Sequence, residues 1–150
     1  SMNLEQPDFL PDSLESGTPN TVGIISLKAG IEFIKRLTPE RIYNHEEKLC
    51  RRFIKGIENI PNCIIYRSSK ASYVPIVSFN IENVSPEETA AYLNEKGFCL
   101  RAGLHCAGLA HKNIGTEEGT VRFAPSVFNN EYEVVQIVNV LKKFADTKRK

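Results

Sequence analysis

The order of helix-like and strand-like patterns restricts this chain to few architectures. Apolar residues recur at helical spacing in the segments 22–37, 39–59, 86–96 and 131–144. Shorter strand-like segments lie at 63–66, 76–81, 98–101 and 120–123. The two kinds of segment do not alternate, and no strand-like segment has the long apolar run of a buried parallel strand. We therefore expect an α+β fold: a small, mostly antiparallel sheet with helices packed on one face.

Polar residues and a glycine mark the expected ends of these helices. Side-chain oxygens of Asn, Ser and Thr accept hydrogen bonds from the free N–H groups of a first helical turn, and proline suits the first helical position. The expected starts are Asn20 or Thr21, Thr38 with Pro39, Ser85 with Pro86, and Asn130. Gly97 is expected to end the third helix, because glycine readily adopts the conformation that follows a helix C-terminus.

Charge and cysteine content argue against several classes of function. A net charge of +1 over 150 residues gives no reason to expect binding to nucleic acid or to a membrane, and no apolar run is long enough to span a bilayer. Four cysteines occur without a Cys-x-x-Cys pair, so we expect neither a structural zinc site nor a disulfide framework. Cys50, Cys63 and Cys99 fall in apolar patterns and are expected to be buried thiols of a cytoplasmic protein.

The fourth cysteine lies in a loop with several glycines. Residues 101–108 read Arg-Ala-Gly-Leu-His-Cys-Ala-Gly, and glycine recurs at positions 115 and 119, which argues against a rigid element. We interpret Cys106 as a chemically active thiol on a loop that can move it, with His105 adjacent and His111 nearby. A cysteine-protease dyad would need a third, orienting group. A metal site through these three residues lacks a fourth ligand. Both are weaker interpretations.

Arg122 lies between two apolar strand residues, Val121 and Phe123. An arginine in this setting either pairs with a carboxylate of the protein or presents its guanidinium fork to a carboxylate of a ligand. The candidates for a pair are Glu117, Glu118 and Glu131. The residues alone leave both interpretations open.

A Gly-Thr-Pro turn at positions 17–19 precedes the first expected helix. Such a turn can present a hydroxyl and backbone N–H groups to an anion. It can equally serve only to cap the helix, and the pattern does not distinguish the two.

Taken together, these motifs resemble one family. The sequence Glu-Ser-Gly-Thr-Pro-Asn at 15–20, with Gly23 and Gly30, the loop segment 101–107, and Val-Arg-Phe at 121–123, with Phe-Asn-Asn at 128–130, resemble the C-terminal part of a cysteine desulfurase. Cysteine desulfurases are pyridoxal-phosphate enzymes of fold type I, related to class V aminotransferases. The loop with its downstream arginine is the specific part of the resemblance. Gly108 departs from it, because related sequences often carry proline there.

The resemblance implies a role for each residue. With pyridoxal 5'-phosphate as cofactor and electron sink, Cys106 attacks the sulfur of L-cysteine, or the selenium of selenocysteine, with His105 flanking it. Alanine leaves, and for cysteine a persulfide stays on Cys106 until a sulfur-acceptor protein takes it. Arg122, with Asn129, holds the substrate carboxylate. The turn at Gly17 and Thr18 binds the cofactor phosphate. In a homodimer, this is the phosphate of the cofactor in the neighbouring subunit.

The resemblance also implies an incomplete enzyme. We expect an irregular lead-in with the phosphate turn at 1–20, a small C-terminal domain at 21–150, and no large domain with the cofactor lysine, so that the chain alone is inactive. A fragment of a selenocysteine lyase or of an aminotransferase, and a non-catalytic sulfur-relay domain, are the alternatives. A plain aminotransferase needs no thiol at Cys106, and a relay domain has no use for Arg122.

Overall fold

The structure, a computed structural model, describes residues 7–15, 17–68 and 70–148. Its contacts divide the chain into two compact units, Ser1–Pro39 and Glu40–Lys150. The first unit contains helix α1, which spans Thr21–Leu37 as its apolar spacing predicts. The side-chain oxygen of Asn20 accepts a hydrogen bond from the Gly23 N–H at 2.9 Å and so caps this helix.

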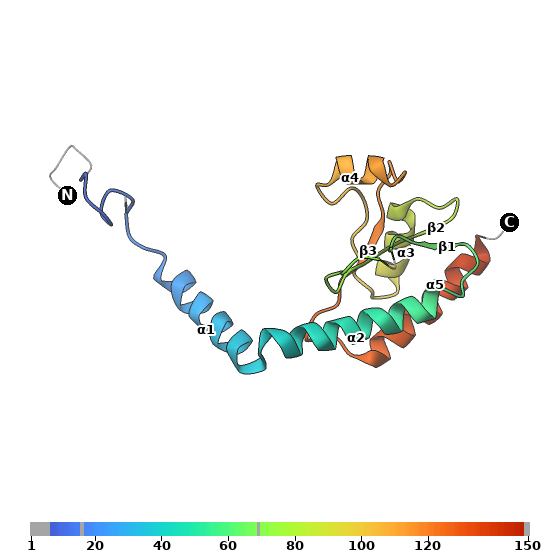
Figure 1. Ribbon diagram of the computed structural model, residues 1–150, viewed down its shortest axis with the longest axis horizontal. Coiled ribbons are helices and arrows are strands. Elements are labelled where there is room, and N and C mark those ends of the chain that lie inside the picture. Colours follow the sequence, from blue (N-terminus) through green and yellow to red (C-terminus); the bar gives the residue numbers. More distant parts are fainter. Residues whose placement is uncertain (1–6, 16, 69, 149–150) are drawn as a thin grey trace. The chain divides into compact units, whose positions relative to one another are not determined.

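The second unit is built on an antiparallel sheet, which has three strands in the part of the chain that is described (Figure 1). The strands are β1 (Cys63–Ile65), β2 (Val77–Ile81) and β3 (Val121–Phe123), in the order β1-β2-β3. In β2, Ile81 pairs with Cys63 of β1 and Val77 pairs with Phe123 of β3. Each strand lies inside a segment that the sequence pattern predicts, and the α+β class is confirmed.

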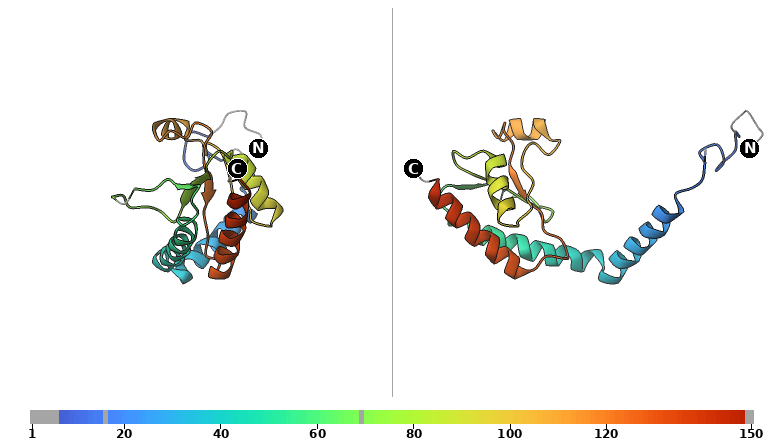
Figure 2. Two further views of the ribbon diagram at one scale, coloured as in Figure 1. Left: turned by 90° about the vertical axis from the view of Figure 1, so that its right-hand side faces the viewer. Right: turned by 180° about the vertical axis from the view of Figure 1, so that it is seen from behind.

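One face of this sheet is buried against helices. Alternate residues of β2, at 77, 79 and 81, are buried, whereas residues 78 and 80 between them are only half-buried. Phe53 of helix α2 (Pro39–Ile57) stacks on Phe123 with ring centroids 4.1 Å apart and meets Phe79 edge-on at 5.4 Å. Helix α5 (Glu131–Thr147) lies beside α2 on the same side of the sheet (Figure 2).

The close approach of α2 and α5 depends on a glycine. A β-carbon at Gly56 of α2 would lie 2.6 Å from a methyl carbon of Val138 in α5. Helix α3 (Pro86–Glu95) completes the unit through contacts with β2, β3 and α5. The core is therefore continuous from the two long helices to the sheet that carries Arg122.

Three more of the predicted helix ends follow their caps, whereas Thr38, the predicted cap of the second helix, has a φ of 65° and its N–H donates to the Ile34 carbonyl at the end of α1. Ser85 Oγ accepts from the Glu88 N–H at 3.1 Å at the start of α3. Asn130 Oδ1 accepts from the Glu133 N–H at 3.1 Å, and Glu133 Oε2 accepts from the Asn130 N–H at 2.9 Å, which is a capping box. Gly97, with a φ of 87°, follows α3 in a Schellman motif: the N–H groups of residues 97 and 98 donate to the carbonyls of residues 94 and 93.

Two predictions near this helix end are wrong. The expected strand over 98–101 is reduced to one antiparallel bridge, between Arg101 and Arg122. The reason is local, because the Phe98 N–H is used by the Schellman motif and the Leu100 N–H donates to the Phe98 carbonyl at 3.1 Å. Cys99 is exposed, not buried, because its neighbours Phe98 and Leu100 are the residues of this segment that pack on the core.

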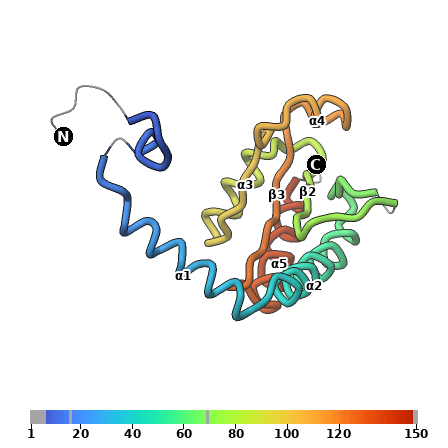
Figure 3. Tube along the Cα trace, turned by 60° about the vertical axis from the view of Figure 1, so that its left-hand side comes forward, coloured from blue at the N-terminus to red at the C-terminus, as the bar shows by residue number. Residues whose placement is uncertain are grey.

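The segment between the bridge and β3 contains a short helix, α4 (Gly108–Asn113). It lies on the side of the sheet away from α2 and α5 (Figure 3). The sequence pattern predicts a loop there and does not reveal this helical turn. The loop with Cys106 is thus displayed at one end of the unit, apart from its core.

Candidate functional site

Backbone hydrogen bonds between the two ends of the Cys106 loop hold its base together. Gly103 and Thr120 exchange two hydrogen bonds, each N–H donating to the other residue's carbonyl at 3.2 Å, and the Arg122 N–H donates to the Arg101 carbonyl at 2.8 Å. Gly119, with a φ of 92°, passes directly over Gly103: a β-carbon at Gly119 would lie 2.2 Å from the Gly103 carbonyl carbon. Glycine is required at 119 for both conformation and space.

Cys106 lies at the tip of the loop, in a tight turn. The Ala107 N–H donates to the Leu104 carbonyl at 2.8 Å, and the two central residues, His105 and Cys106, have φ values of 48° and 62°. Positive φ at both central positions belongs to a type I′ turn, which favours Gly and Asn. Each of these L residues therefore carries conformational strain of about 1–2 kcal/mol. The Cys106 side chain is exposed.

His105 ties this turn to the strand that follows it. Its Nε2–H donates to the Thr120 carbonyl at 3.0 Å, whereas its Nδ1 is buried and has no hydrogen-bond partner among the described residues. Burial lowers the pKa of His105 below its ordinary value of 6.5, the nearby Arg122, Arg101 and His111 lower it further, and the hydrogen bond to Thr120 opposes them. The neutral ring with the proton on Nε2 is the form that fits these contacts.

The far end of the loop has its own anchor. His111 of α4 is buried, its Nδ1 lies 2.8 Å from Thr116 Oγ1, and its carbonyl accepts from the Thr116 N–H at 2.9 Å. The rings of His111 and His105 have centroids 6.2 Å apart. His111 is thus engaged in holding α4 and does not reach back as a free base. The described residues include no group of three or more His, Cys, Asp or Glu side chains placed to hold a metal ion.

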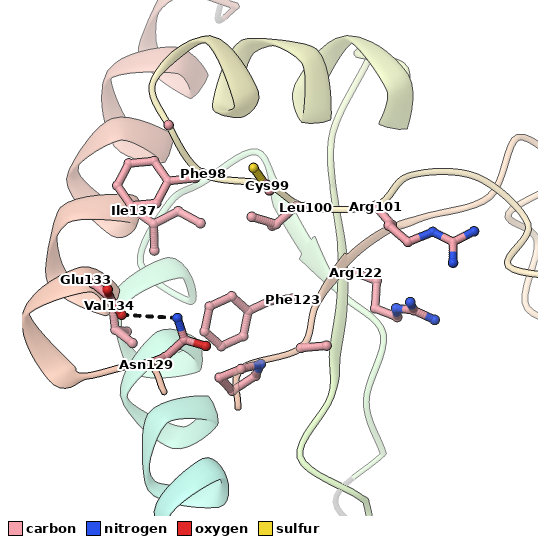
Figure 4. Close-up of a pocket in the computed structure, with 13 residues that line it drawn as sticks. Phe98, Cys99, Leu100, Arg101, Arg122, Phe123, Asn129, Glu133, Val134 and Ile137 are labelled. Atoms are coloured by element: carbon pink, nitrogen blue, oxygen red, sulfur yellow. Dashed lines mark hydrogen bonds between the residues drawn. The ribbon is translucent and has the colours of Figure 1, made fainter. Parts of the chain in front are cut away.

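Arg122 and Arg101 line an open pocket of about 560 Å³ between the end of α3, β3 and α5. Figure 4 shows their guanidinium groups extending side by side, away from Phe123. Neither guanidinium forms an ion pair among residues 7–15, 17–68 and 70–148, and Glu131 is engaged by Lys48 and Arg52. Among the described residues, Arg122 therefore forms none of the glutamate pairs that the sequence offers as one interpretation.

Asn129 lines the same pocket, but its amide is already committed. Its Oδ1 accepts from the Ser126 N–H at 2.9 Å, and its Nδ2 donates to Glu133 Oε2 at 3.1 Å (Figure 4). Its carbonyl accepts from His45 Nε2 of α2 at 2.9 Å. Asn129 therefore stabilises the turn between β3 and α5. Its side chain lies on the side of the pocket away from the Arg122 guanidinium (Figure 4).

Gly17 and Thr18 belong to the other unit and precede the cap of α1. Ser16 lies outside the described residues. Both Gly17 and Thr18 are exposed, and the space where a Gly17 β-carbon would lie is open. Their N–H and hydroxyl groups are donors of the kind that bind a phosphate oxygen.

The four thiols divide by environment. Cys50 is buried and Cys63 half-buried, and burial raises the pKa of each to about 12, so both remain protonated and unreactive at neutral pH. Cys99 and Cys106 are exposed. Of these, Cys106 alone lies in the left-handed turn beside a histidine.

No helix in the described part of the chain is both long and apolar enough to cross a membrane.

Comparison with known proteins identifies the family. Residues 1–137 match the family described as "Aminotransferase class-V", and the chain belongs to the class V aminotransferases. It is 32% identical to a "Probable cysteine desulfurase" of Pyrococcus abyssi and 34% identical to one of Methanothermobacter thermautotrophicus, covering 93% and 92% of this chain. The alignments span 34% and 35% of those proteins, so the chain corresponds to about a third of their length.

The fold agrees with the sequence relationship. The apo structure of the cysteine desulfurase from Thermococcus onnurineus NA1 matches with a TM-score of 0.84 at 33% identity, over 91% of this chain and 34% of that one. The chain is thus homologous to part of the cysteine desulfurases. Sequence reasoning singles out Cys106, His105 and Arg122 as candidates and quotes Arg101 only as part of the loop segment. The contacts that Arg101 and Thr120 make with these residues depend on strand pairing, which no local pattern reveals.

Proposed function

We propose that this chain is the small, C-terminal, sulfur-accepting domain of a pyridoxal-phosphate-dependent cysteine desulfurase. The observation that carries the proposal is an exposed thiol, Cys106, in a turn with positive φ at the tip of the loop. Backbone hydrogen bonds join the base of this loop to the strand of Arg122, which has no ion pair among the described residues. Homology to cysteine desulfurases over a third of their length supports it. A domain that only relayed sulfur would need the thiol but not the arginine.

Cys106 is the proposed nucleophile. Its thiolate attacks the sulfur of L-cysteine, so that a new S–S bond forms while the substrate's C–S bond breaks. The electron pair of the C–S bond remains with the three-carbon fragment, which takes up a proton and leaves as alanine. The transferred sulfur remains on Cys106 as a persulfide, and the exposed turn gives a sulfur-acceptor protein access to it.

His105 is proposed to position this thiol. Its Nε2–H is committed to Thr120, and the adjacent cationic groups disfavour a second proton on the ring. A neutral His105 therefore keeps the turn attached to β3 through one hydrogen bond. Release of that bond would let the tip move while the Gly103–Thr120 pair holds the base, which is how a loop can carry a thiol between substrate and acceptor.

Arg122 is proposed to bind the substrate carboxylate with its guanidinium fork. β3 presents this side chain on the face opposite the core, because Val121 and Phe123 on either side of it are buried. Asn129 is proposed to act indirectly, by stabilising the turn that forms one wall of the pocket. These contacts would orient the substrate sulfur toward Cys106.

The class V family uses pyridoxal 5'-phosphate, and the donors at Gly17 and Thr18 suit its phosphate. We place Thr18 on the phosphate of the cofactor bound by the partner subunit of a homodimer. When bound, the cofactor supplies an electron sink for breaking the C–S bond. The cofactor lysine is proposed to lie outside this chain, so the 150 residues alone are expected to be inactive. A visible absorbance band after adding pyridoxal phosphate, removed by mutating one lysine, would contradict this.

The test joins the chain to the cofactor-binding region of a cysteine desulfurase and supplies pyridoxal phosphate, L-cysteine and a reductant. We expect equal amounts of alanine and sulfide, and a mass increase of one sulfur atom on Cys106 when the reductant is omitted. Cys106→Ala should abolish both signals while the cofactor colour remains, and Cys63→Ala, in β1 away from the loop, should retain them. Sulfide release by Cys106→Ala at the unmodified rate would overturn the proposal.

A further inference from the structure

Asn80 of β2 connects the sheet to the segment that carries the Cys106 loop. The pairing of β2 with β3 ends at Phe79 and Val121. Beyond this pair, Asn80 Nδ2 donates to the Gly119 carbonyl at 3.0 Å, and Asn80 Oδ1 accepts from the Val121 N–H at 3.2 Å. One amide side chain thus bonds two positions of the neighbouring segment and continues the connection where the strand pairing stops.

These partners fix the orientation of the Asn80 amide. A backbone N–H can only donate and a backbone carbonyl can only accept, so the amide oxygen faces Val121 and the amide nitrogen faces Gly119. The nitrogen also donates to the Tyr66 hydroxyl, just beyond β1, at 3.3 Å. Both N–H groups of this half-buried amide are therefore used. An apolar side chain of similar size could fill the same space but could form none of these hydrogen bonds.

Thr120 lies between the two positions that Asn80 bonds, and the Cys106 loop is attached to it. Thr120 is fully buried and exchanges two hydrogen bonds with Gly103 at 3.2 Å. Its carbonyl also accepts from His105 Nε2 at 3.0 Å. Any displacement of Thr120 therefore moves the base of the loop through Gly103 and the turn at its tip through His105.

We propose that Asn80 is a positioning residue for the Cys106 thiol: it fixes Thr120 beside β2, and Thr120 in turn fixes the base and the tip of the loop. Asn80 is not among the residues that line the pocket of Arg122, so its effect on the site is transmitted through backbone hydrogen bonds. The connection itself rests on these contacts. Only its importance for sulfur transfer rests on the proposed function.

The first test measures amide hydrogen exchange in the 150-residue chain. Asn80→Leu removes the hydrogen bonds at similar side-chain size. Asn62→Leu is the matched control, because Asn62 Nδ2 also donates to a backbone carbonyl, that of Ala145, at 3.2 Å. The Thr120 N–H donates to Gly103 and not to Asn80, so its exchange reports on transmission. Relative to the Phe53 N–H in the core, this exchange should rise at least about tenfold in Asn80→Leu and stay unchanged in Asn62→Leu. Equal ratios in the two variants would overturn the proposal.

The second test follows the tip of the loop through His105. Burial lowers the pKa of this ring, so release of the loop should return the pKa toward its ordinary value of 6.5. Titration of the histidine ring protons by nuclear magnetic resonance should show this rise in Asn80→Leu and no change in Asn62→Leu. An unchanged pKa of His105 in folded Asn80→Leu would contradict the proposal.

Asn80→Asp provides a second variant if Asn80→Leu does not fold. It keeps the shape of the side chain and the acceptor for the Val121 N–H, but it places an oxygen in front of the Gly119 carbonyl. The relative exchange of the Thr120 N–H should again rise. Exchange at the unmodified rate would count against a role for the amide donor and overturn the proposal.

The third test uses the chain joined to the cofactor-binding region. Asn80→Leu should slow persulfide formation on Cys106 at least about tenfold while the cofactor colour remains, because small misplacements of a reacting group are costly. Asn62→Leu should retain the rate. Equal rates in Asn80→Leu and the unmodified joined protein would refute the role in sulfur transfer. If the unmodified joined protein transfers no sulfur, the proposed function fails, whereas the exchange measurement still decides whether Asn80 holds the loop.

Discussion

Replacing Gly119 by alanine tests whether the base of the loop is held by a close backbone contact. The new β-carbon would lie 2.2 Å from the carbonyl carbon of Gly103 and 2.4 Å from its oxygen, so the two segments must move apart. The φ of 92° adds a conformational cost of about 1–2 kcal/mol for a residue with a side chain. Separation breaks the two Gly103–Thr120 hydrogen bonds, each contributing about 1 kcal/mol. We expect Gly119→Ala to lose about 3–4 kcal/mol in total.

Gly97 supplies the matched control. It has a similar φ of 87°, but nothing lies within 4 Å of the position its β-carbon would take. Gly97→Ala should therefore lose only the conformational part, about 1–2 kcal/mol. Urea denaturation followed by circular dichroism measures both, and the rate of Cys106 alkylation reports on the loop. If the two variants lose the same free energy of unfolding, the close contact contributes nothing and the reasoning is refuted.

Three further predictions follow from burial and charge. In the native chain, a thiol reagent should modify Cys106 quickly and Cys50 only on unfolding, because burial raises the pKa of Cys50 to about 12; rapid reaction of Cys50 would contradict the packing. The lowered pKa of His105 means that the unfolded chain binds a proton at higher pH than the folded chain does. Stability should therefore fall as the pH drops below about 6.5 toward the folded-state pKa, and this part of the slope should vanish in His105→Gln, as urea titrations across pH can show. Phe53→Ala, at a fully buried ring stacked on Phe123, should lose about 3–5 kcal/mol of unfolding free energy, and a loss below 1 kcal/mol would mean that the core is not packed as described.

The four longer helices and most of their caps, unlike the short helix α4, could be predicted because their signals are local. Asn20, Ser85 and Asn130 each accept from an N–H three residues ahead, and Gly97 adopts the positive φ that ends α3. These contacts depend on residues within one or two turns, and a single sequence contains all of them. The apolar spacing of α2 and α5 likewise places the side chains that form the core.

The strand at 98–101 was wrongly predicted because pairing is not local. Whether Phe98 or Leu100 joins a sheet depends on which partner backbone lies opposite, and the Schellman motif places the Phe98 N–H elsewhere. The same limit applies at the site. Cys106 could be singled out as a candidate from residue type and glycine context, whereas for Arg122 the residues alone leave a glutamate pair and a ligand contact both open. The left-handed turn could not, since His and Cys do not favour positive φ.

β3 contains only three residues, and the register in which they pair with β2 determines which side chains face the core. Val121 and Phe123 are buried while Arg122 between them faces outward. A slip of β3 by one residue against β2 would turn every side chain over, driving a guanidinium into the core and a phenyl ring into water. Misregistered folding would therefore fail as a whole rather than yield a stable protein with a displaced arginine. Substitutions that relax the packing of Phe123 should accordingly destabilise the whole unit rather than displace Arg122 within a folded chain.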